Sequence, residues 1–257
     1  MIKIETFKDF IKDMLAYDPA LIIHCLGVSN IAWQLAIHLK MESQLNYLAY
    51  GGLLHDIGKV KIPKSILHKQ GPLTDAEKIV IQRHPIEGVH ALALQNIKEE
   101  FQEIVLYHHE RWDGAGYLGI RGDNIPLNSQ IISLADAIDA MLSNRPYRAA
   151  RSPLEVYADI LRCSGSQFSP NLVKELQQSR FWPKGESPLE LVNSLLEYER
   201  WWLNYLEEVF KGLRHPLILI QSKKIDRLLI SHYKHNNKIK QDFKKRFVGE
   251  GVRLHGV

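Results

Sequence analysis

Apolar residues recur at helical spacing along most of the chain, and this pattern predicts an all-α protein. After Asp18-Pro19, which suits a helix start with proline in the first turn, apolar side chains repeat with a period near 3.6 over 21–36. Three further starts fit capping boxes, at 74–77, 152–155 and 187–190. Other helices are expected over 43–57, 98–109, 127–144 and 170–178, and no segment shows a convincing period-two strand pattern.

Two interruptions of this pattern suggest how the chain is organised. Residues 112–128 are rich in Gly, Asn and Asp, so they predict a long ordered loop, which is often functional. Pro183-Lys184-Gly185 marks the second break. We therefore expect one domain over residues 1–180, with a short helical lead-in, and a basic helical C-terminal extension over residues 181–257. Within this extension, helices are expected at 187–213 and 222–247.

Composition is that of an ordinary globular chain, with 45% hydrophobic and 24% charged residues among 257. Cys25 and Cys163 form no disulfide framework and match no zinc motif, and no signal peptide precedes them. No run approaches about 18 consecutive apolar residues. We therefore expect a cytoplasmic protein without a transmembrane segment.

Positive charge is concentrated near the C-terminus. Residues 211–257 hold 12 Lys and Arg against 3 Asp and Glu, whereas the rest of the chain has a net charge of −5. Nucleic acid is therefore not expected as a partner of the main domain. The preferred interpretation of the helix at 222–247 is an amphipathic helix with its charged face in solvent and its apolar side packed against another part of the protein. The alternative is attachment to an acidic partner, a nucleic acid or an anionic membrane.

Five of the twelve histidines lie in settings that suggest chemistry, namely His24, His55, His84, His108 and His109. His55-Asp56 follows an apolar run, and burying both groups costs several kcal/mol unless they are paired or bound to a metal. His108-His109 closes another apolar helix. Helical neighbours diverge by about 100°, which favours two adjacent metals over one.

A single histidine is more often a hydrogen-bonded helix residue than a ligand, so the metal hypothesis depends on the combination. The two adjacent pairs are joined by Asp136, which also lies in an apolar setting. Nitrogen and oxygen donors without thiolates are typical of iron, manganese or zinc.

The order of the motifs resembles the HD-GYP phosphodiesterases, a branch of the HD metal-dependent phosphohydrolases. The resemblance covers about residues 15–180 and implies an HD-domain helical bundle. The matching motifs are His55-Asp56 with Gly58-Lys59, Ile62-Pro63, Leu73-Thr74 with Glu77, His84-Pro85 with Gly88, His108 to Tyr117, Ile125-Pro126-Leu127, Asp136 with Asp139, and Arg145-Pro146-Tyr147-Arg148.

This resemblance implies hydrolysis of cyclic di-GMP by a metal-bridging hydroxide, with Asp56 and Lys59 as catalytic residues. Two divalent ions, iron or manganese ahead of zinc, would be bridged by Asp56. The implied metal ligands are His24, His55, Asp56, His84, His108, His109 and Asp136. Lys59, Gly116, Tyr117, Arg145 and Arg148 are the implied substrate-binding residues, although both arginines could instead be surface charges.

Three positions depart from the family pattern. Leu118 stands where the signature has proline, which alters a loop and removes no metal ligand. Ala20 stands where some members carry a glutamate that supports a third metal, and this favours two metals and the linear product pGpG. Gln130 replaces a common arginine.

The alternatives are a catalytically weak cyclic di-GMP receptor and a phosphohydrolase for another cyclic dinucleotide. Only about 15 residues precede the motifs. We therefore expect control to come from expression, from residues 181–257, or from a protein partner. Such a partner would contact the basic C-terminal helix or the loop that carries Gly116-Tyr117-Leu118, which we call the signature loop.

Overall fold

A computed structural model describes residues 4–143 and 151–178 of the chain. Over these residues the protein is helical and contains no β-strand, apart from an isolated bridge between Ser164 and Phe168. The predicted all-α fold is confirmed. The chain divides into two compact units, Met1–Lys184 and Gly185–Val257. The extension predicted over residues 181–257, with its two helices, lies outside the described residues and stays a prediction.

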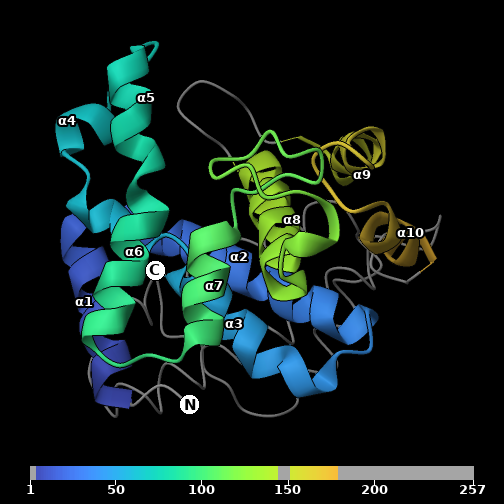
Figure 1. The fold of residues 1–257 in the computed structure, drawn as a ribbon, viewed down its shortest axis with the longest axis horizontal. Coiled ribbons are helices and arrows are strands. Elements are labelled where there is room, and N and C mark those ends of the chain that lie inside the picture. The colour runs from blue at the N-terminus through green and yellow to red at the C-terminus, as the bar shows by residue number, and fades with distance from the viewer. Residues whose placement is uncertain (1–3, 144–150, 179–257) are drawn as a thin grey trace, which may run out of the picture. The chain divides into compact units, whose positions relative to one another are not determined.

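Among the described helices, the longest stretch between two neighbours in sequence, residues 108–126, separates α7 from α8 (Figure 1). The described helices are α1 (Ile4–Tyr17), α2 (Pro19–His38), α3 (Leu45–Leu54), α4 (Lys64–Leu67), α5 (Asp75–Gln82), α6 (His84–Leu94), α7 (Glu99–Tyr107), α8 (Leu127–Leu142), α9 (Pro153–Arg162) and α10 (Pro170–Gln178). Short 3₁₀ turns are η1 (Glu42–Gln44), η2 (Ile57–Lys61) and η3 (Gly122–Asn124).

Helix α2 forms the centre of the domain. Asp18 caps its N-terminus by accepting a hydrogen bond from the Ala20 amide at 2.8 Å, and Pro19 occupies the first turn as expected. By length and composition α2 could span a membrane, yet 72% of its most apolar stretch is buried inside the protein. Burial of this kind is typical of the core helix of a folded domain.

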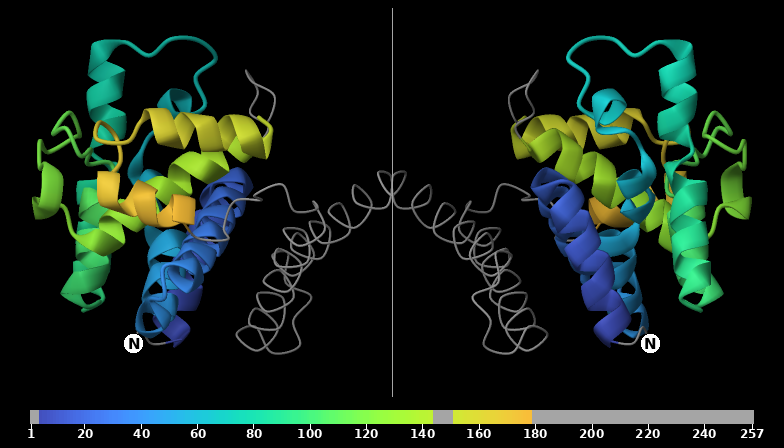
Figure 2. Two further views of the ribbon diagram at one scale, coloured as in Figure 1. Left: turned by 90° about the vertical axis from the view of Figure 1, so that its right-hand side faces the viewer. Right: turned by 90° about the vertical axis from the view of Figure 1, so that its left-hand side faces the viewer.

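The other helices pack around α2. Helices α3 and α8 lie against it, α7 contacts both of them, and α6 packs on α7 and on η2 (Figure 1). Helix α9 crosses beside α8 (Figure 2). Fully buried side chains from α2, α3, α7, α8 and α9 meet in one apolar core, which includes Leu35, Leu48, Ile104, Leu134 and Val156.

Helix boundaries differ from the predicted ones where chemistry is expected. The capping boxes at Thr74 and Ser152 are present. The loop predicted over 112–128 is confirmed as far as Pro126, with η3 inside it, whereas Leu127 and Asn128 already belong to α8. The helix expected over 43–57 is divided among η1, α3 and η2, and α7 ends two residues before the predicted limit. Consequently five of the seven candidate metal ligands lie at helix ends or directly after them, whereas His24 and Asp136 lie within α2 and α8.

Candidate metal centre

The structure brings together all seven residues that the resemblance implied as metal ligands. His24 comes from α2 and Asp136 from the middle of α8. His55 and Asp56 follow α3 directly, His84 opens α6, and His108-His109 follow α7. His55, Asp56, His84 and His108 are fully buried.

Asp56 lies at the centre of this cluster. Its Oδ1 atom is 3.2 Å from His84 Nε2 and 3.8 Å from His108 Nε2. Its Oδ2 atom is 3.3 Å from His55 Nε2 and 3.7 Å from His24 Nε2. Four imidazoles therefore direct the same ring nitrogen toward one carboxylate.

Backbone carbonyls determine which nitrogen carries the proton in three of these imidazoles. The Nδ1 atoms of His55, His84 and His108 lie 2.7, 2.8 and 2.8 Å from the carbonyl oxygens of Gly52, Ile81 and Val105. Because a carbonyl oxygen only accepts, each Nδ1 donates its proton there. In a neutral imidazole the Nε2 atom then presents a lone pair.

Acceptor atoms consequently face other acceptor atoms. His84 Nε2 lies 3.2 Å from His108 Nε2 and equally close to Asp56 Oδ1. Neither Asp56 Oδ1 nor His55 Nε2 has a hydrogen-bond partner, although both are buried. Unpartnered buried acceptors cost roughly 1–3 kcal/mol each. A cation among them removes that cost, so the donor set fits a metal ion.

Two groups of side chains could each hold such an ion, and both include Asp56. One consists of Asp56, His84, His108 and His109, and the other of His24, His55 and Asp56. Within each group the ligand atoms lie within 4.8 Å of one another. Asp136 joins the second group, because its Oδ1 atom is 3.1 Å from His24 Nε2.

The adjacent pair His108-His109 differs from the expectation in one respect. A continuous helix would have turned the two rings about 100° apart and toward different metals. Helix α7 instead ends at Tyr107, and the ring centroids of His108 and His109 lie 4.1 Å apart. Both imidazoles therefore belong to the same ligand group.

The charges in the cluster are strongly coupled. Burial raises the pKa of the Asp56 carboxyl, but the Lys59 ammonium and His55 hold that pKa well below its usual range. Burial likewise lowers the pKa of Lys59, but Asp56, 2.5 Å from its Nζ atom, keeps it above the usual value. Burial and the neighbouring His84 lower the pKa of His109 to about 3. Asp56 is therefore an anion, Lys59 a cation and His109 a neutral imidazole.

Asp139 was part of the matched motif but received no role from the sequence. Its Oδ2 atom lies 2.7 Å from His24 Nδ1, which directs His24 Nε2 toward Asp56 and Asp136. Asp136 and Asp139 are three residues apart on α8 and so share a helix face. That spacing is the signal that could have identified Asp139.

The predicted substrate-binding residues are only partly described. Lys59 lies in η2 beside Asp56, and Gly116-Tyr117 lie in the loop after α7. The Tyr117 ring is 4.6 Å from the His109 ring and 38% of the residue is exposed. Arg145 and Arg148 lie outside the described residues.

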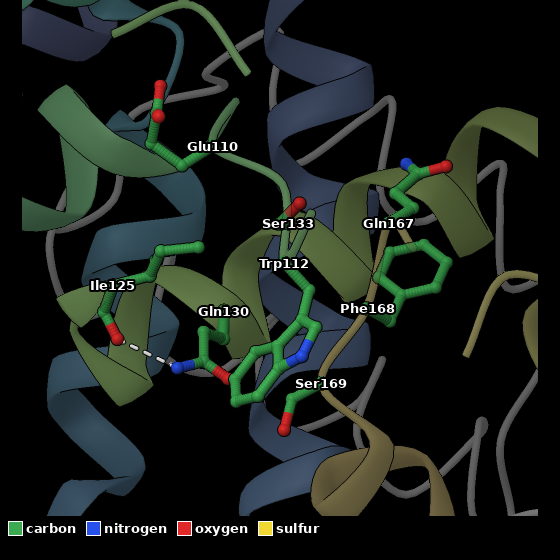
Figure 3. Close-up of a pocket in the computed structure, with 8 residues that line it drawn as sticks. All are labelled: Glu110, Trp112, Ile125, Gln130, Ser133, Gln167, Phe168 and Ser169. Carbon is green, nitrogen blue, oxygen red and sulfur yellow. Dashed lines mark hydrogen bonds between the residues drawn. The ribbon is translucent and has the colours of Figure 1, made fainter. Parts of the chain in front are cut away.

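Gln130 lines a separate shallow cleft beside the signature loop (Figure 3). Its Nε2 atom donates a hydrogen bond to the Ile125 carbonyl at 2.7 Å. The other lining residues are Glu110, Trp112, Ile125, Ser133, Gln167, Phe168 and Ser169, and none of the seven cluster residues is among them. Gln130 thus contributes to loop packing in the described part of the chain.

Comparison with known proteins gives a family match over the same segment. A family model described as an HD domain matches residues 9–172, more than half of the chain. A cyclic di-GMP phosphodiesterase of Thermotoga maritima is 40% identical over 155 residues, which cover 59% of this chain and 42% of that protein. A 3'3'-cGAMP-specific phosphodiesterase 1 of Vibrio cholerae is 38% identical over 168 residues, covering 63% and 38%.

A solved structure supports the fold. An HDG"Y"P protein from Bdellovibrio bacteriovorus superimposes with a TM-score of 0.51 at 20% identity, covering 62% of this chain and 51% of that one. The chain spans only about two fifths of the two curated relatives above. The family match nonetheless includes every residue of the cluster and confirms the resemblance drawn from the motifs. The chain belongs to the HD domain family.

Proposed function

We propose that this chain is a metal-dependent phosphodiesterase that hydrolyses cyclic di-GMP, mainly to pGpG. The observation that carries the proposal is the set of buried acceptor atoms around Asp56, which a metal ion would partner. Relatives named cyclic di-GMP phosphodiesterases, 33–43% identical to this chain, support the choice of substrate.

Two divalent ions would share Asp56 as the bridging ligand. His84, His108 and His109 would complete one site, and His24, His55 and Asp136 the other. When bound, such a pair supplies a nucleophile from water near neutral pH and stabilises charge on a phosphate oxygen. Iron or manganese suits the nitrogen and oxygen donors, and no cysteine belongs to either group in the described residues.

Lys59 would hold the scissile phosphate. It is a cation with about a fifth of its side chain exposed, so its ammonium can turn toward a ligand while remaining close to Asp56. Its positive charge opposes the negative charge that develops at phosphorus during attack. Tyr117 would contact the nucleotide beside it, and Arg145 and Arg148 stay predicted as further ligand contacts.

The resemblance to the family favours two ions, because Ala20 stands where some members carry a glutamate for a third metal. Ala20 lies four positions before His24 on α2, so the two share a helix face. Alanine offers no ligand atom for a third ion. We therefore expect two ions and cleavage of a single phosphodiester bond, with action in the cytoplasm as predicted from the sequence.

Anaerobic purification, metal analysis and product chromatography with cyclic di-GMP test this proposal. We expect two iron or manganese ions per chain and formation of pGpG. His55→Ala should lose both metal and product. His90→Ala, which changes an exposed histidine on α6, is the matched control and should retain both. If the chain binds both metal and cyclic di-GMP but forms no product, the proposed phosphodiesterase activity is refuted and a receptor is indicated.

A second candidate substrate has direct support. Three relatives of Vibrio cholerae named 3'3'-cGAMP-specific phosphodiesterases are 36–40% identical to this chain, similar to the relatives named for cyclic di-GMP. Both dinucleotides should therefore be assayed side by side. A kcat/KM for 3'3'-cGAMP that exceeds the value for cyclic di-GMP would reassign the substrate and retain the phosphodiesterase.

A further inference from the structure

Glu110 follows the metal-cluster residue His109 and points into the signature loop. It is only 3% exposed. One carboxylate oxygen accepts the Leu118 amide proton and the other accepts the Ile120 amide proton, each at 2.7 Å between heavy atoms. Glu110 also lines the cleft beside Trp112 and Gln130, but Figure 3 shows its carboxylate pointing away from these two side chains. Its two partners are both backbone amides of the loop.

Gly116 is held against the same residue from the other side. A Cβ atom at Gly116 would lie 2.6 Å from Glu110 Cα, 2.8 Å from the His109 carbonyl oxygen and 2.9 Å from the Arg111 amide nitrogen. All three are backbone atoms, which cannot swing aside as a flexible side chain can. Only glycine allows the loop backbone to lie directly on the turn that follows α7.

Tyr117 lies between Gly116 and Leu118, the two loop residues that contact Glu110. Gly116 packs on the Glu110 backbone, and the Leu118 amide is bound by the Glu110 carboxylate. The Tyr117 ring lies 4.6 Å from the His109 ring with 36° between their planes, and part of it stays exposed. The loop therefore presents one side of the ring to the metal cluster and leaves the remainder free for a ligand.

We propose that Glu110 is a positioning residue that fixes Tyr117 beside the metal centre and thereby governs substrate affinity, while leaving metal binding unchanged. The proposal rests on the phosphodiesterase function above and extends it to a residue outside the ligand set. A carboxylate offers two acceptor oxygens, which is what two converging N–H groups need. A glutamine offers one oxygen and one NH₂ group, and the NH₂ group would face an amide proton.

Glu110→Gln tests this directly, because it preserves size and removes one acceptor. Hydrogen exchange at the amides of Leu118 and Ile120 should accelerate by about tenfold or more. If the positioned loop is then populated about one tenth of the time, KM should rise about tenfold, with kcat within about threefold of wild type. Metal content should equal that of wild type, because all seven cluster residues remain.

Two further variants keep the test decisive. Gly116→Ala disturbs the packing of the signature loop on the Glu110 backbone without changing the carboxylate, so it should also raise KM. This variant replaces Glu110→Gln in the test if Glu110→Gln does not fold. Asp113→Asn is the matched control. Asp113 lies in the same loop and is partly exposed. It accepts the Ala115 amide proton and forms a salt bridge with Arg111. It should leave exchange at Leu118 and Ile120 unchanged.

The outcomes separate this proposal from the proposed function. Wild-type KM and wild-type exchange in a folded Glu110→Gln variant overturn the role of Glu110, whatever the substrate. Loss of metal from that variant also overturns it, because the residue would then support the ligands instead of the loop. If the wild-type chain turns over no cyclic dinucleotide, the phosphodiesterase proposal fails. The claim about substrate affinity then fails with it, whereas accelerated exchange would still assign Glu110 to the loop.

Discussion

Removing Asp139 should weaken one half of the metal centre selectively. Asp139 Oδ2 lies 2.7 Å from His24 Nδ1, while His24 Nε2 lies 3.1 Å from Asp136 Oδ1. A neutral imidazole has a single N–H group. Burial lowers the pKa of His24, but Asp136 and Asp139 raise it to about 10, so a metal at Nε2 must displace a proton there. The hydrogen bond to Asp139 keeps the remaining proton on Nδ1 and directs Nε2 toward the metal. Asp139→Ala removes this constraint and lets the ring rotate or change tautomer.

The expected loss of metal affinity depends on which groups orient the histidines in each half of the metal centre. Carboxylates that orient a metal-bound histidine typically contribute 10–100-fold to metal affinity, equivalent to about 1.4–2.8 kcal/mol. His84 and His108 are oriented by the carbonyls of Ile81 and Val105, which the substitution does not change. We therefore expect one ion to bind with wild-type affinity and the other to bind 10–100-fold more weakly.

A chelator-competition titration of the purified chain measures both affinities. Asp139→Asn keeps an oxygen that can accept the Nδ1 proton, so it should lose less affinity than Asp139→Ala. Asp9→Ala removes an exposed carboxylate on α1 and is the control for charge alone. Equal weakening of both ions, or an unchanged titration curve in folded Asp139→Ala, would refute the reasoning.

Two other predictions concern charge and packing. Lys59→Gln should lower kcat by about 10²–10³-fold, because the cation that faces the phosphate is lost. Metal content, measured by elemental analysis, should not fall, and a kcat within threefold of wild type would exclude the assigned role. Leu48→Ala should cost about 2–5 kcal/mol in the free energy of unfolding, because Leu48 is fully buried in the core. Ile79→Ala on α5, where the side chain is 61% exposed, should cost less than about 0.5 kcal/mol in the same denaturation experiment.

Local signals in the sequence were sufficient for most helix starts. Asp18 before Pro19, Thr74 with Glu77 and Ser152 with Glu155 were each predicted to cap a helix, and each does so. These interactions join residues two or three positions apart, so they need no knowledge of the fold. Helix α8 has no side-chain cap, but its apolar spacing alone predicted a helix over 127–144, and it spans 127–142.

The features that escaped prediction depend on contacts distant in sequence or on where a helix stops. Asp139 and His24 are 115 residues apart, and only the packing of α8 on α2 brings them together. Glu110 gains its role from amides eight and ten residues later, across an irregular loop. The break between α5 and α6 was not predicted either, although Pro85 in the first turn of α6 is typical of a helix start.

Helix ends explain why a histidine that follows an apolar run lies in the candidate metal centre. The carbonyls that bind His55, His84 and His108 belong to the last turns of α3, α5 and α7. The last four carbonyls of a helix lack intrahelical hydrogen-bond partners. Each histidine donates its Nδ1 proton to one of these carbonyls, three residues earlier in the chain. One hydrogen bond thus caps the helix and fixes the tautomer at the same time.

The position of these histidines at helix C-termini also affects the electrostatics of the site. A helix C-terminus carries a partial negative charge, and a nearby cation gains about 0.3–2 kcal/mol from it. The ends of α3 and α7 each lie one imidazole ring away from Asp56, whose own carboxylate is ionised. The end of α5 is offset by the positive N-terminus of α6, which begins at His84. The negative charge of the site therefore comes from two helix ends as well as from its acids. Removing a single acid should accordingly weaken the attraction for cations without reversing it, because these two helix ends remain.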